Sequence, residues 1–256
     1  VDESGNIYVV DGCCTPNGNL KKYDSNGNFI WNVSFSPTPP TGVTVDNSGN
    51  IYVALGRTQP NDVNELKKFD SNGNLLLTFG SMPSTNGCFV PVAPRTIEFG
   101  PDGNIWVGVG NGCTIPWTGN NWNGVAMIQK YSTGGSLMSS FGSFGEDMSF
   151  TDSSGVYHSD TADWGEFGQF GPGAITFDGG YLFAADSKNK RIQKFTLGGS
   201  FVEGYNLGIS SYGPTDLVAY NGNFYLIGQH SATTSDRASI YTYSTLEMLA
   251  NPSLDI

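Results

Sequence analysis

The sequence predicts an all-β protein, and its composition carries this prediction. Of the 256 residues, 35 are glycine, whereas charged residues make up only 14%, well below the roughly 25% of an average soluble domain. Long surface helices and coiled coils need many Glu, Lys and Ala residues, so this composition favours short strands joined by tight turns. No apolar run reaches the roughly 18 residues of a transmembrane helix.

A short phrase recurs along the chain and decides the architecture. VDESGNIYVV returns almost unchanged as VDNSGNIYVA and FGPDGNIWVG, and two weaker copies follow, so the copies begin at residues 1, 45, 99, 177 and 220. A second phrase trails each copy, typified by LKKFDSNGNLLLTFG from Leu66. Both phrases alternate apolar and polar residues around an Asn-Gly, Asp-Gly or Gly-Gly turn, which is the pattern of a β-hairpin.

Each repeat therefore holds four short strands. In the second repeat these are GVTV (42–45), NIYVA (50–54), ELKKF (65–69) and LLLTF (75–79). Five four-stranded units of about 40 to 45 residues predict a β-propeller. We expect one domain over residues 1–256, with blades near 1–35, 36–80, 81–145, 146–208 and 209–256.

The phrase from Pro40 to Ala54, together with NKRIQKF at Asn189–Phe195, resembles the NHL-repeat family of propellers. The resemblance covers most of the chain in five copies, and it implies NHL-like blades, of which members of this family usually have six. Three arrangements stay open: a five-bladed ring, a degenerate sixth blade within Gly145–Gly171, or a blade missing upstream of Val1.

The two termini are expected to meet in the first blade. Pro252–Ile256 has the same spacing to the initial VDESGN as Pro40–Thr44 has to VDNSGN, so the last residues would supply the first strand of that blade. Closure within one chain is favoured because a free sheet edge lowers solubility. The alternative is exchange of this strand between neighbouring chains. The start at Val1, without an initiator Met, indicates a processed chain or a fragment.

Short and long connections alternate along the chain. The turns between first and second strands, and between third and fourth, are minimal and define a plain face. The remaining connections are long and define an elaborated face, the usual place for binding and catalysis: residues 56–64, 81–94, 110–123, 145–171 and 229–237. We therefore expect function on the elaborated face.

Four aromatic residues in these connections are candidate binding residues: Trp117, Trp122, Trp164 and Phe167. Exposed aromatic rings on loops are typical of sugar stacking or protein contact. The alternative, given equal weight, is that the rings roof the loops as a small satellite core.

The longest connection is acidic. Six carboxylates and no Lys or Arg lie between Glu146 and Glu166, and His158 lies among them with Asp160 and Asp163. The group would serve as a Ca²⁺ site, as an acid–base pair built on His158, or as a solvated acidic loop, which we favour. His230, the second histidine, lies in another long connection.

All four cysteines, Cys13, Cys14, Cys88 and Cys113, are expected on the elaborated face. Their spacing is not that of a zinc knuckle. An even number in a Gly- and Asn-rich acidic chain favours an extracellular or cell-surface location over four unrelated thiols. We expect a disulfide between Cys88 and Cys113 that fastens two long loops. Cys13 and Cys14 would then form a vicinal disulfide or stay reduced.

The net charge of −11, from 12 basic and 23 acidic residues, repels phosphate backbones and argues against nucleic acid as a partner. Lysines recur in the third strand of the repeats, where we expect a sparse basic stripe of solvated side chains: Lys21, Lys22, Lys67, Lys68, Lys130 and Lys194. RNA-binding NHL proteins are basic on one face, and this chain departs from that pattern.

Enzymes occur on similar propellers, and FGPDGNIWVG resembles the repeat of streptogramin lyases. Two histidines are too few for a three-histidine zinc site, and no nucleophile elbow, P-loop or dinucleotide motif is present. A calcium site in the central channel would need ligands such as Glu98, Asp178 and Asp216.

The predicted function is that of a non-catalytic extracellular module without a cofactor. It would bind a protein or glycan through the elaborated face, or assemble as a subunit of a surface layer or filament. The alternative is a calcium-dependent hydrolase, lactonase or lyase with a site in the channel, because a fold alone does not supply an activity.

Overall fold

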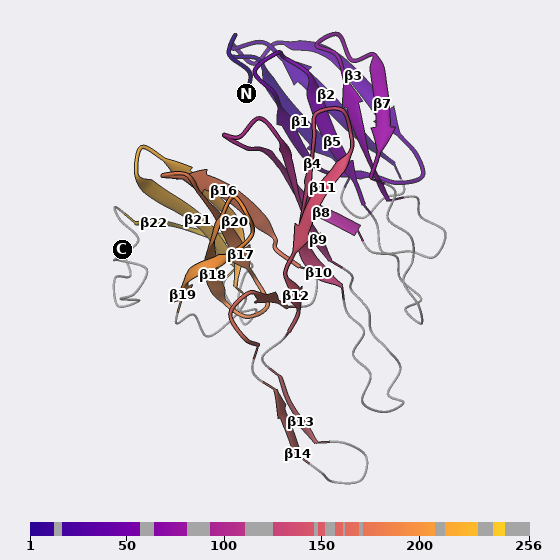
Figure 1. Ribbon diagram of the computed structural model, residues 1–256. Helices are drawn as coiled ribbons and strands as arrows, with labels where there is room; N and C mark the ends of the chain where they lie inside the picture. Colours follow the sequence, from indigo (N-terminus) through magenta and orange to yellow (C-terminus); the bar gives the residue numbers. More distant parts are fainter. Residues whose placement is uncertain are drawn as a thin grey trace. The chain divides into compact units, whose positions relative to one another are not determined.

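The computed structural model describes residues 1–12, 17–56, 64–80, 93–110, 125–145, 148–151, 157–160, 162–168, 171–207, 213–229 and 238–243, and within 148–151, 157–160, 228–229 and 238–243 the backbone alone. Every secondary-structure element assigned in these ranges is a β-strand. None of the described residues forms a helix able to cross a membrane. The chain divides into two compact units: unit 1 is 1–124 with 129–140, and unit 2 is 125–128 with 141–256 (Figure 1).

Unit 1 contains two sheets and most of a third, and their strands pair in chain order. The first sheet has β1 (Ile7–Asp11), β2 (Gly18–Tyr23) and β3 (Phe29–Phe35), and the second has β4 (Pro40–Val45), β5 (Ile51–Leu55), β6 (Glu65–Phe69) and β7 (Leu75–Phe79). The third has β8 (Ala93–Phe99), β9 (Ile105–Gly110), β10 (Ala126–Tyr131) and β11 (Leu137–Phe141).

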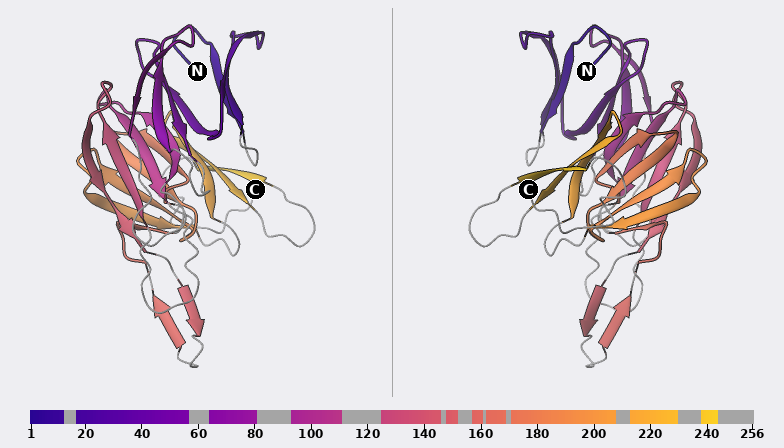
Figure 2. Two further views of the ribbon diagram at one scale, coloured as in Figure 1. Left: turned by 90° about the vertical axis from the view of Figure 1, so that its right-hand side faces the viewer. Right: turned by 90° about the vertical axis from the view of Figure 1, so that its left-hand side faces the viewer.

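Unit 2 contains the fourth and fifth sheets, preceded by an insertion. The fourth sheet has β16 (Ala174–Asp178), β17 (Tyr181–Asp186), β18 (Arg191–Thr196) and β19 (Phe201–Asn206), and the fifth has β20 (Pro214–Tyr220), β21 (Asn223–Gln229) and β22 (Ala238–Tyr243). The insertion holds β12 (Ser143–Phe144), β13 (Met148–Thr151), β14 (Tyr157–Asp160) and β15 (Glu166–Phe167). In both views of Figure 2 each unit is a set of separate small sheets.

The all-β prediction and the four-stranded antiparallel repeat are confirmed. In the second sheet, β6 and β7 coincide with the predicted strands, and β4 and β5 lie within two residues of them. The register is antiparallel throughout this sheet. The alternating phrases therefore predict both the strands and their order.

Second strands carry much of the core. β5 and β9 are buried at every residue. In β5 this follows because Ile51 and Val53 pack into a cluster with Leu20 and Phe35 of the first sheet, while the strand also contacts β8 of the third. A second cluster joins the fourth and fifth sheets in the same way around Phe183 and Phe224, whose ring centroids are 4.8 Å apart. Burial on both faces makes such strands continuously apolar.

The repeated Asp of the first turn is a hydrogen-bond acceptor for the whole turn. Asp46 accepts from the N–H groups of Ser48 and Asn50, from the Asn50 side chain and from the Tyr52 hydroxyl at 3.0 Å. Burial disfavours the charged form, but these donors outweigh it and lower the pKa of Asp46. Gly49 has a φ of 78°, as the turn requires. Asp2 makes the same four bonds in the first sheet.

Neighbouring sheets within a unit are joined through their first strands. In unit 1 the Phe99 N–H of β8 donates to Thr44 Oγ1 of β4 at 3.0 Å, and in unit 2 the Ala219 N–H of β20 donates to Thr176 Oγ1 of β16 at 3.0 Å. The two threonines occupy the same position of the repeat, so one side chain performs the same role twice.

The insertion does not form a sixth four-stranded sheet in its described part. β13 and β14 pair as an isolated hairpin, and β12 pairs in parallel with β15. The first sheet has three strands among the described residues, and the predicted closing segment 252–256 lies outside them. The number of blades, the meeting of the termini and the single-domain organisation therefore stay predictions.

Candidate functional site

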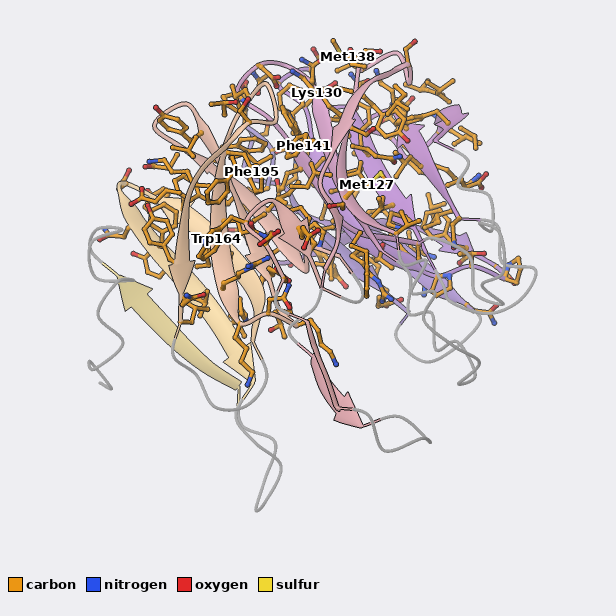
Figure 3. All side chains as sticks on the ribbon, turned by 60° about the horizontal axis from the view of Figure 1, so that its bottom comes forward. Met127, Lys130, Met138, Phe141, Trp164 and Phe195 are labelled. Atoms are coloured by element: carbon orange, nitrogen blue, oxygen red, sulfur yellow. The ribbon has the colours of Figure 1, made fainter. Side chains whose placement is uncertain are left out.

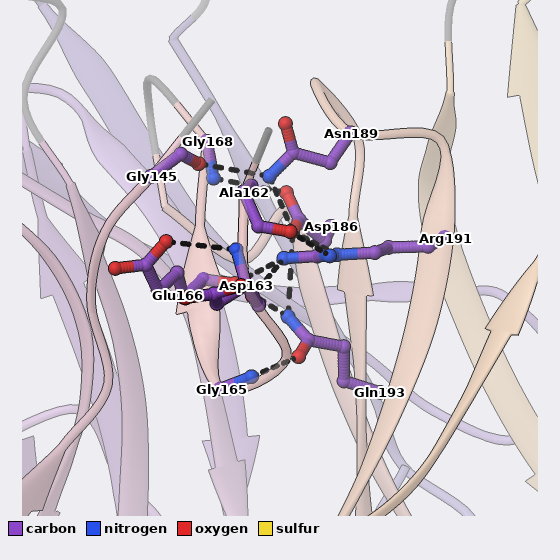
Figure 4. A network of polar contacts seen from close by, with 10 residues as sticks. All are labelled: Gly145, Ala162, Asp163, Gly165, Glu166, Gly168, Asp186, Asn189, Arg191 and Gln193. Carbon is purple, nitrogen blue, oxygen red and sulfur yellow. Dashed lines mark hydrogen bonds and ion pairs between the residues drawn. The ribbon is translucent and has the colours of Figure 1, made fainter. Parts of the chain in front are cut away.

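The candidate site is built on the end of the insertion, residues 162–168, where it lies against the fourth sheet. Four polar side chains of that sheet hold it: Asp186 at the end of β17, Asn189 in the following turn, and Arg191 and Gln193 on β18 (Figure 4). All four are at least nine-tenths buried. Buried polar groups are costly unless they are hydrogen-bonded, so their partners explain their presence.

Arg191 makes most of the contacts to the insertion. Its guanidinium donates to the carbonyl oxygens of Ala162 at 3.0 Å, Asp163 at 2.8 Å and Glu166 at 2.8 Å. Its Nε donates to Asp186 Oδ2 at 3.0 Å. The planar fork of an arginine is suited to holding several acceptors at fixed angles, so a single side chain fixes the path of the insertion's backbone.

Gln193 and Asn189 complete the attachment. Gln193 accepts from the Gly165 N–H at 2.7 Å and donates to the Glu166 carbonyl at 2.6 Å. Asn189 donates to the Gly145 carbonyl at 2.9 Å. The insertion is thus held close to its beginning and near its end, and all of these contacts lie within unit 2.

Asp186 is the central acceptor of this network. It accepts from the Gly168 N–H at 3.1 Å, from Asn189 at 2.9 Å, from Gln193 at 3.3 Å and from Arg191. Burial raises the pKa of Asp186, and the hydrogen bonds from Gly168, Asn189 and Arg191, with the charge of Arg191, oppose that effect only in part. Loss of either member of such a buried charged pair leaves the other uncompensated.

Trp164 lies on the outer strands of the fourth sheet (Figure 3). Its ring stacks on Phe201 with centroids 5.6 Å apart and planes 18° apart, and the Arg191 guanidinium carbon is 4.8 Å from its centroid. A Cβ on Gly204 of β19 would stand 2.0 Å from its Cζ3. The ring therefore packs directly over Gly204, at a position where any side chain would clash with it.

The exposed part of this arrangement is a small apolar surface, which we call the Trp164 patch. It consists of Trp164, 42% exposed, its stacking partner Phe201, 37% exposed, and Val202, the next residue of β19, 42% exposed. The exposed Asp163 borders it. The sequence predicted Trp164 and Asp163 as site residues. It did not predict that they contact β18 through Arg191, or that Trp164 packs on β19.

The expectation of an exposed ring at Phe167 is corrected. Phe167 is fully buried and packs 5.8 Å from Phe195, with Gly142 leaving room for its edge. Because Phe195 belongs to β18, Phe167 packs against the fourth sheet and is not in a core formed by the loop alone. The physical reason is its place in β15, where pairing with β12 turns the side chain inward.

The other predicted loop residues are only partly placed. His158 and Asp160 lie on β14, where their backbones pair with Phe150 and Met148. Their side chains lie outside the described residues, as do Trp117, Trp122, His230 and the cysteines Cys13, Cys14, Cys88 and Cys113. The predicted disulfides and the roles of these residues stay predictions.

Two of the three candidate calcium ligands, Asp178 and Asp216, are too far apart to share one ion. β16 and β20 run parallel, since Gly173 lies beside the Thr215 carbonyl and Thr176 beside Ala219. Asp178 is therefore four to five residues beyond the level of Asp216, about 15 Å along the strands. One ion with ligands at about 2.4 Å cannot contact both.

Glu98 belongs to unit 1, where its carboxylate lies 3.5 Å from Thr44 Oγ1. Among the described residues no group of three His, Cys, Asp or Glu side chains is placed to hold a metal ion.

The predicted stripe of solvated lysines is also corrected, because most of these lysines are engaged. Lys22 is 9% exposed and donates to the Ser71 carbonyl at 3.0 Å, and Lys68 donates to the Thr133 carbonyl at 3.2 Å. Lys130 pairs with Asp102 at 2.6 Å. Each ammonium group also lies over an aromatic ring of the preceding strand in its sheet, as Lys68 does over Tyr52 at 5.1 Å. These ammonium groups join strands and sheets instead of forming a basic surface.

A polar cavity of about 360 Å³ lies between the first turns of the first and second sheets in unit 1. Asp2 and Asp46 line it with Lys22 and Ser71. Both carboxylates already accept four hydrogen bonds from their own turns, and Lys22 donates to Ser71. These groups therefore stabilise the turns.

Sequence reasoning missed a repeated exposed pair of apolar residues. The first two residues of the fourth strand of the repeat, which is β3 in the first sheet, are exposed by 37% to 57% in four sheets: Phe29–Ile30, Leu75–Leu76, Leu137–Met138 and Phe201–Val202. A register shift leaves Ile30, Leu76 and Val202 without a partner on the third strand. Such a bulge breaks the alternation of the strand, so consecutive side chains face solvent. The sequence signal was an apolar pair directly after each Gly-containing turn.

Solved structures with a similar fold are propellers. Neither a protein-family model nor a curated protein matches this sequence. A catalytically inactive virginiamycin B lyase from Staphylococcus aureus with quinupristin aligns at a TM-score of 0.55 and 13% identity, over 94% of this chain and 67% of that one. A luciferin-regenerating enzyme aligns at 0.55 and 11% identity, over 96% and 70%. The Dos1 propeller aligns at 0.50 and 9%, over 86% and 47%. At these identities the likeness shows the fold alone.

Proposed function

We propose that this chain is a non-catalytic, NHL-like propeller module that binds a partner protein through the Trp164 patch. The observation that carries the proposal is an exposed Trp–Phe pair whose supporting segment is fixed by four buried polar side chains. The recurring NIYV and IQK phrases support the NHL-like assignment.

Physical anatomy supports binding at this patch. Aromatic and arginine residues are the usual centres of binding energy in protein interfaces, and here Trp164 contacts both Phe201 and Arg191. Arg191 and Gln193 hold the backbone of the segment before any partner arrives. A surface ordered in advance loses less conformational entropy on binding.

A protein is favoured over a glycan as the partner. Sugar stacking uses an open aromatic face, whereas Trp164 is already stacked on Phe201, and the next residue of that strand is the exposed aliphatic Val202. The composition and the cysteine count support an extracellular or cell-surface setting. Assembly into a layer or filament is a form of the same proposal in which the partner is another copy of the chain.

The patch predicts a sharp comparison between two variants. Val202→Asp places a charge in the patch, and Val218→Asp places one on β20 of the same unit, where Val218 is 50% exposed. Immobilised wild-type chain and both variants would be exposed to one extracellular extract, and captured species would be quantified by mass spectrometry. We expect at least one species to fall about tenfold with Val202→Asp, about 1.4 kcal/mol, and to stay unchanged with Val218→Asp. Equal capture by all three proteins would refute the proposal.

Native mass spectrometry with and without a chelator separates this proposal from the calcium-enzyme alternative. A mass that falls by one Ca²⁺ on chelation would favour the alternative. An unchanged mass with a captured partner would favour the binding module, and a metal-free oligomer would make another copy of the chain the partner.

A further inference from the structure

The exposed apolar pairs of unit 1 indicate a second binding surface, separate from the Trp164 patch. Three sheets of this unit each present such a pair, at Phe29–Ile30, Leu75–Leu76 and Leu137–Met138 (Met138 is labelled in Figure 3). We propose that the first two pairs, with the Asp turns before them, dock an aromatic segment of a partner protein that also carries basic residues. This surface lies in the unit that does not contain the Trp164 patch, so the two proposals stand independently.

Edge protection alone does not account for the pairs. A bulge in an outer strand discourages pairing with other chains, and polar or charged residues serve that purpose best. Here all the residues of the three pairs are apolar, and each is about half exposed. The next sheet does not cover them: Gly73 packs against Trp31 and Val33, further along β3, and Gly135 packs against Leu77 and Phe79, further along β7.

Unit 2 indicates the aromatic character of the occupant. Phe201 of the equivalent pair there, Phe201–Val202, is contacted by Trp164 from the chain's own insertion. That contact shows what an apolar pair at this position of the repeat accepts, namely a stacked aromatic ring. In the described part of unit 1 no ring from an insertion stacks on the equivalent pairs.

Charge indicates that the occupant is basic. Asp24 and Asp70 lie in the turns directly before Phe29 and Leu75, and side-chain hydrogen bonds from Asn28 and Asn74 lower their pKa values, so both stay ionised. In each of them Oδ2 accepts a single hydrogen bond, from the Asn side chain, which leaves room for a donor from a partner.

The same charges oppose a second copy of the chain as the occupant. The nearby lysines are engaged, Lys22 with Ser71 and Lys68 with Thr133. The whole chain carries a net charge of −11. Two copies meeting through these pairs would bring Asp turns together, and like charges at an interface are unfavourable.

The probe for this surface is a fluorescein-labelled seven-residue peptide of alternating Lys and Trp, followed by anisotropy. Two control peptides replace every Lys by Glu or every Trp by Ser. We expect the Lys/Trp peptide to bind wild type at least tenfold more tightly than either control. Phe29→Ser with Ile30→Ser, or Leu75→Ser with Leu76→Ser, should each weaken binding at least threefold, and all four together at least tenfold.

Matched variants within the chain sharpen the test. The turn before Leu137 begins with Ser132 in place of Asp, so Leu137→Ser with Met138→Ser should weaken binding less than the other pairs. Val1→Ser, at an 82% exposed residue, should leave it unchanged. Asp24→Asn with Asp70→Asn should weaken binding and reduce its salt dependence. Val202→Asp should leave peptide binding intact, which separates this surface from the Trp164 patch.

Two results would overturn the inference. The first is binding of the Lys/Trp peptide that all pair variants retain, which would indicate general attraction to an acidic protein. The second is self-association of wild type in sedimentation experiments that Leu75→Ser with Leu76→Ser abolishes, which would make a second copy the occupant. Unchanged melting temperatures of the variants exclude misfolding as the cause, as expected for exposed residues.

Discussion

Gly204→Ala tests how the insertion is held. The added Cβ would stand 2.0 Å from Trp164 Cζ3 and 2.3 Å from Cε3, too close for any contact, so the ring must leave its seat. The backbone of Gly204 has no positive φ that would itself strain an alanine. The substitution therefore acts on Trp164 and on little else.

The magnitude follows from the buried area of the ring. Aromatic side chains bury about 150 to 250 Å² when enclosed. Trp164 is 42% exposed, so displacing its ring would expose about 120 Å² that is now buried. At about 25 cal/mol per Å² this amounts to about 3 kcal/mol. Replacing Gly by Ala in a strand returns about 0.5 to 1 kcal/mol through the unfolded chain. We expect the free energy of unfolding to fall by about 2 kcal/mol.

A double-mutant cycle isolates the contact. Urea titrations of wild type, Gly204→Ala, Trp164→Ala and the double variant give the four free energies of unfolding. With Trp164 absent, Gly204→Ala should be neutral or should stabilise by about 0.5 to 1 kcal/mol, so the coupling energy should be about 2 to 3 kcal/mol. An equal cost of Gly204→Ala in both backgrounds would show that Trp164 does not rest on Gly204.

Three further predictions follow from the described contacts. Asp186→Asn should cost about 3 kcal/mol, because it leaves the buried Arg191 without its counter-charge; Arg191→Met in the same chain should recover part of that loss in chemical unfolding, and no recovery would contradict the pairing. Lys68→Met should cost about 1 kcal/mol through loss of the Thr133 bond and the Tyr52 ring contact, whereas Lys67→Met, whose partner is the partly exposed Glu65, should cost less in thermal melts. Because its pKa is lowered in the folded state, Asp46 contributes stability that is present above about pH 4 and is lost as the pH falls through the folded pKa. Asp46→Asn should therefore reduce the fall of the melting temperature at acid pH. The same fall in wild type and variant would show that Asp46 is not its cause.

The repeat explains how much of the fold was predictable. Local chemistry sets the strands: Asp46 caps its turn, Gly49 supplies the positive φ, and the apolar residues of β5 follow at once. Such signals lie within a few residues of one another, so a single sequence contains them. The same applies to the third strands, where Leu20 and Leu66 occupy one position of the phrase and are both fully buried.

The site was harder to predict because its contacts join distant segments. Trp164 and Gly204 are forty residues apart in a chain whose other repeats have Asn32, Thr78 and Ser140 at the position of Gly204. Only the folded register, Gln193 opposite Gly204, shows why glycine is needed there. Burial of Phe167 was equally hidden, because the β12–β15 pairing that turns it inward has no turn signal.

Departures from the repeat in the fourth sheet bear on function more than the repeat itself does. Ile192 and Phe195 keep the apolar frame of the third strand and are buried like Leu66 and Phe69. Between and beside them, Arg191 and Gln193 replace Glu65 and Lys67. The second sheet forms without an arginine or glutamine at these positions, so the replacements are not required by the sheet. Their hydrogen bonds go instead to residues 162–166. Gln193 recurs as Gln129 in the third sheet, whereas Arg191 has no counterpart in the other sheets. Arg191, the side chain that distinguishes this sheet from its neighbours, therefore serves to present Trp164, which is the expectation for a binding site added to a structural repeat.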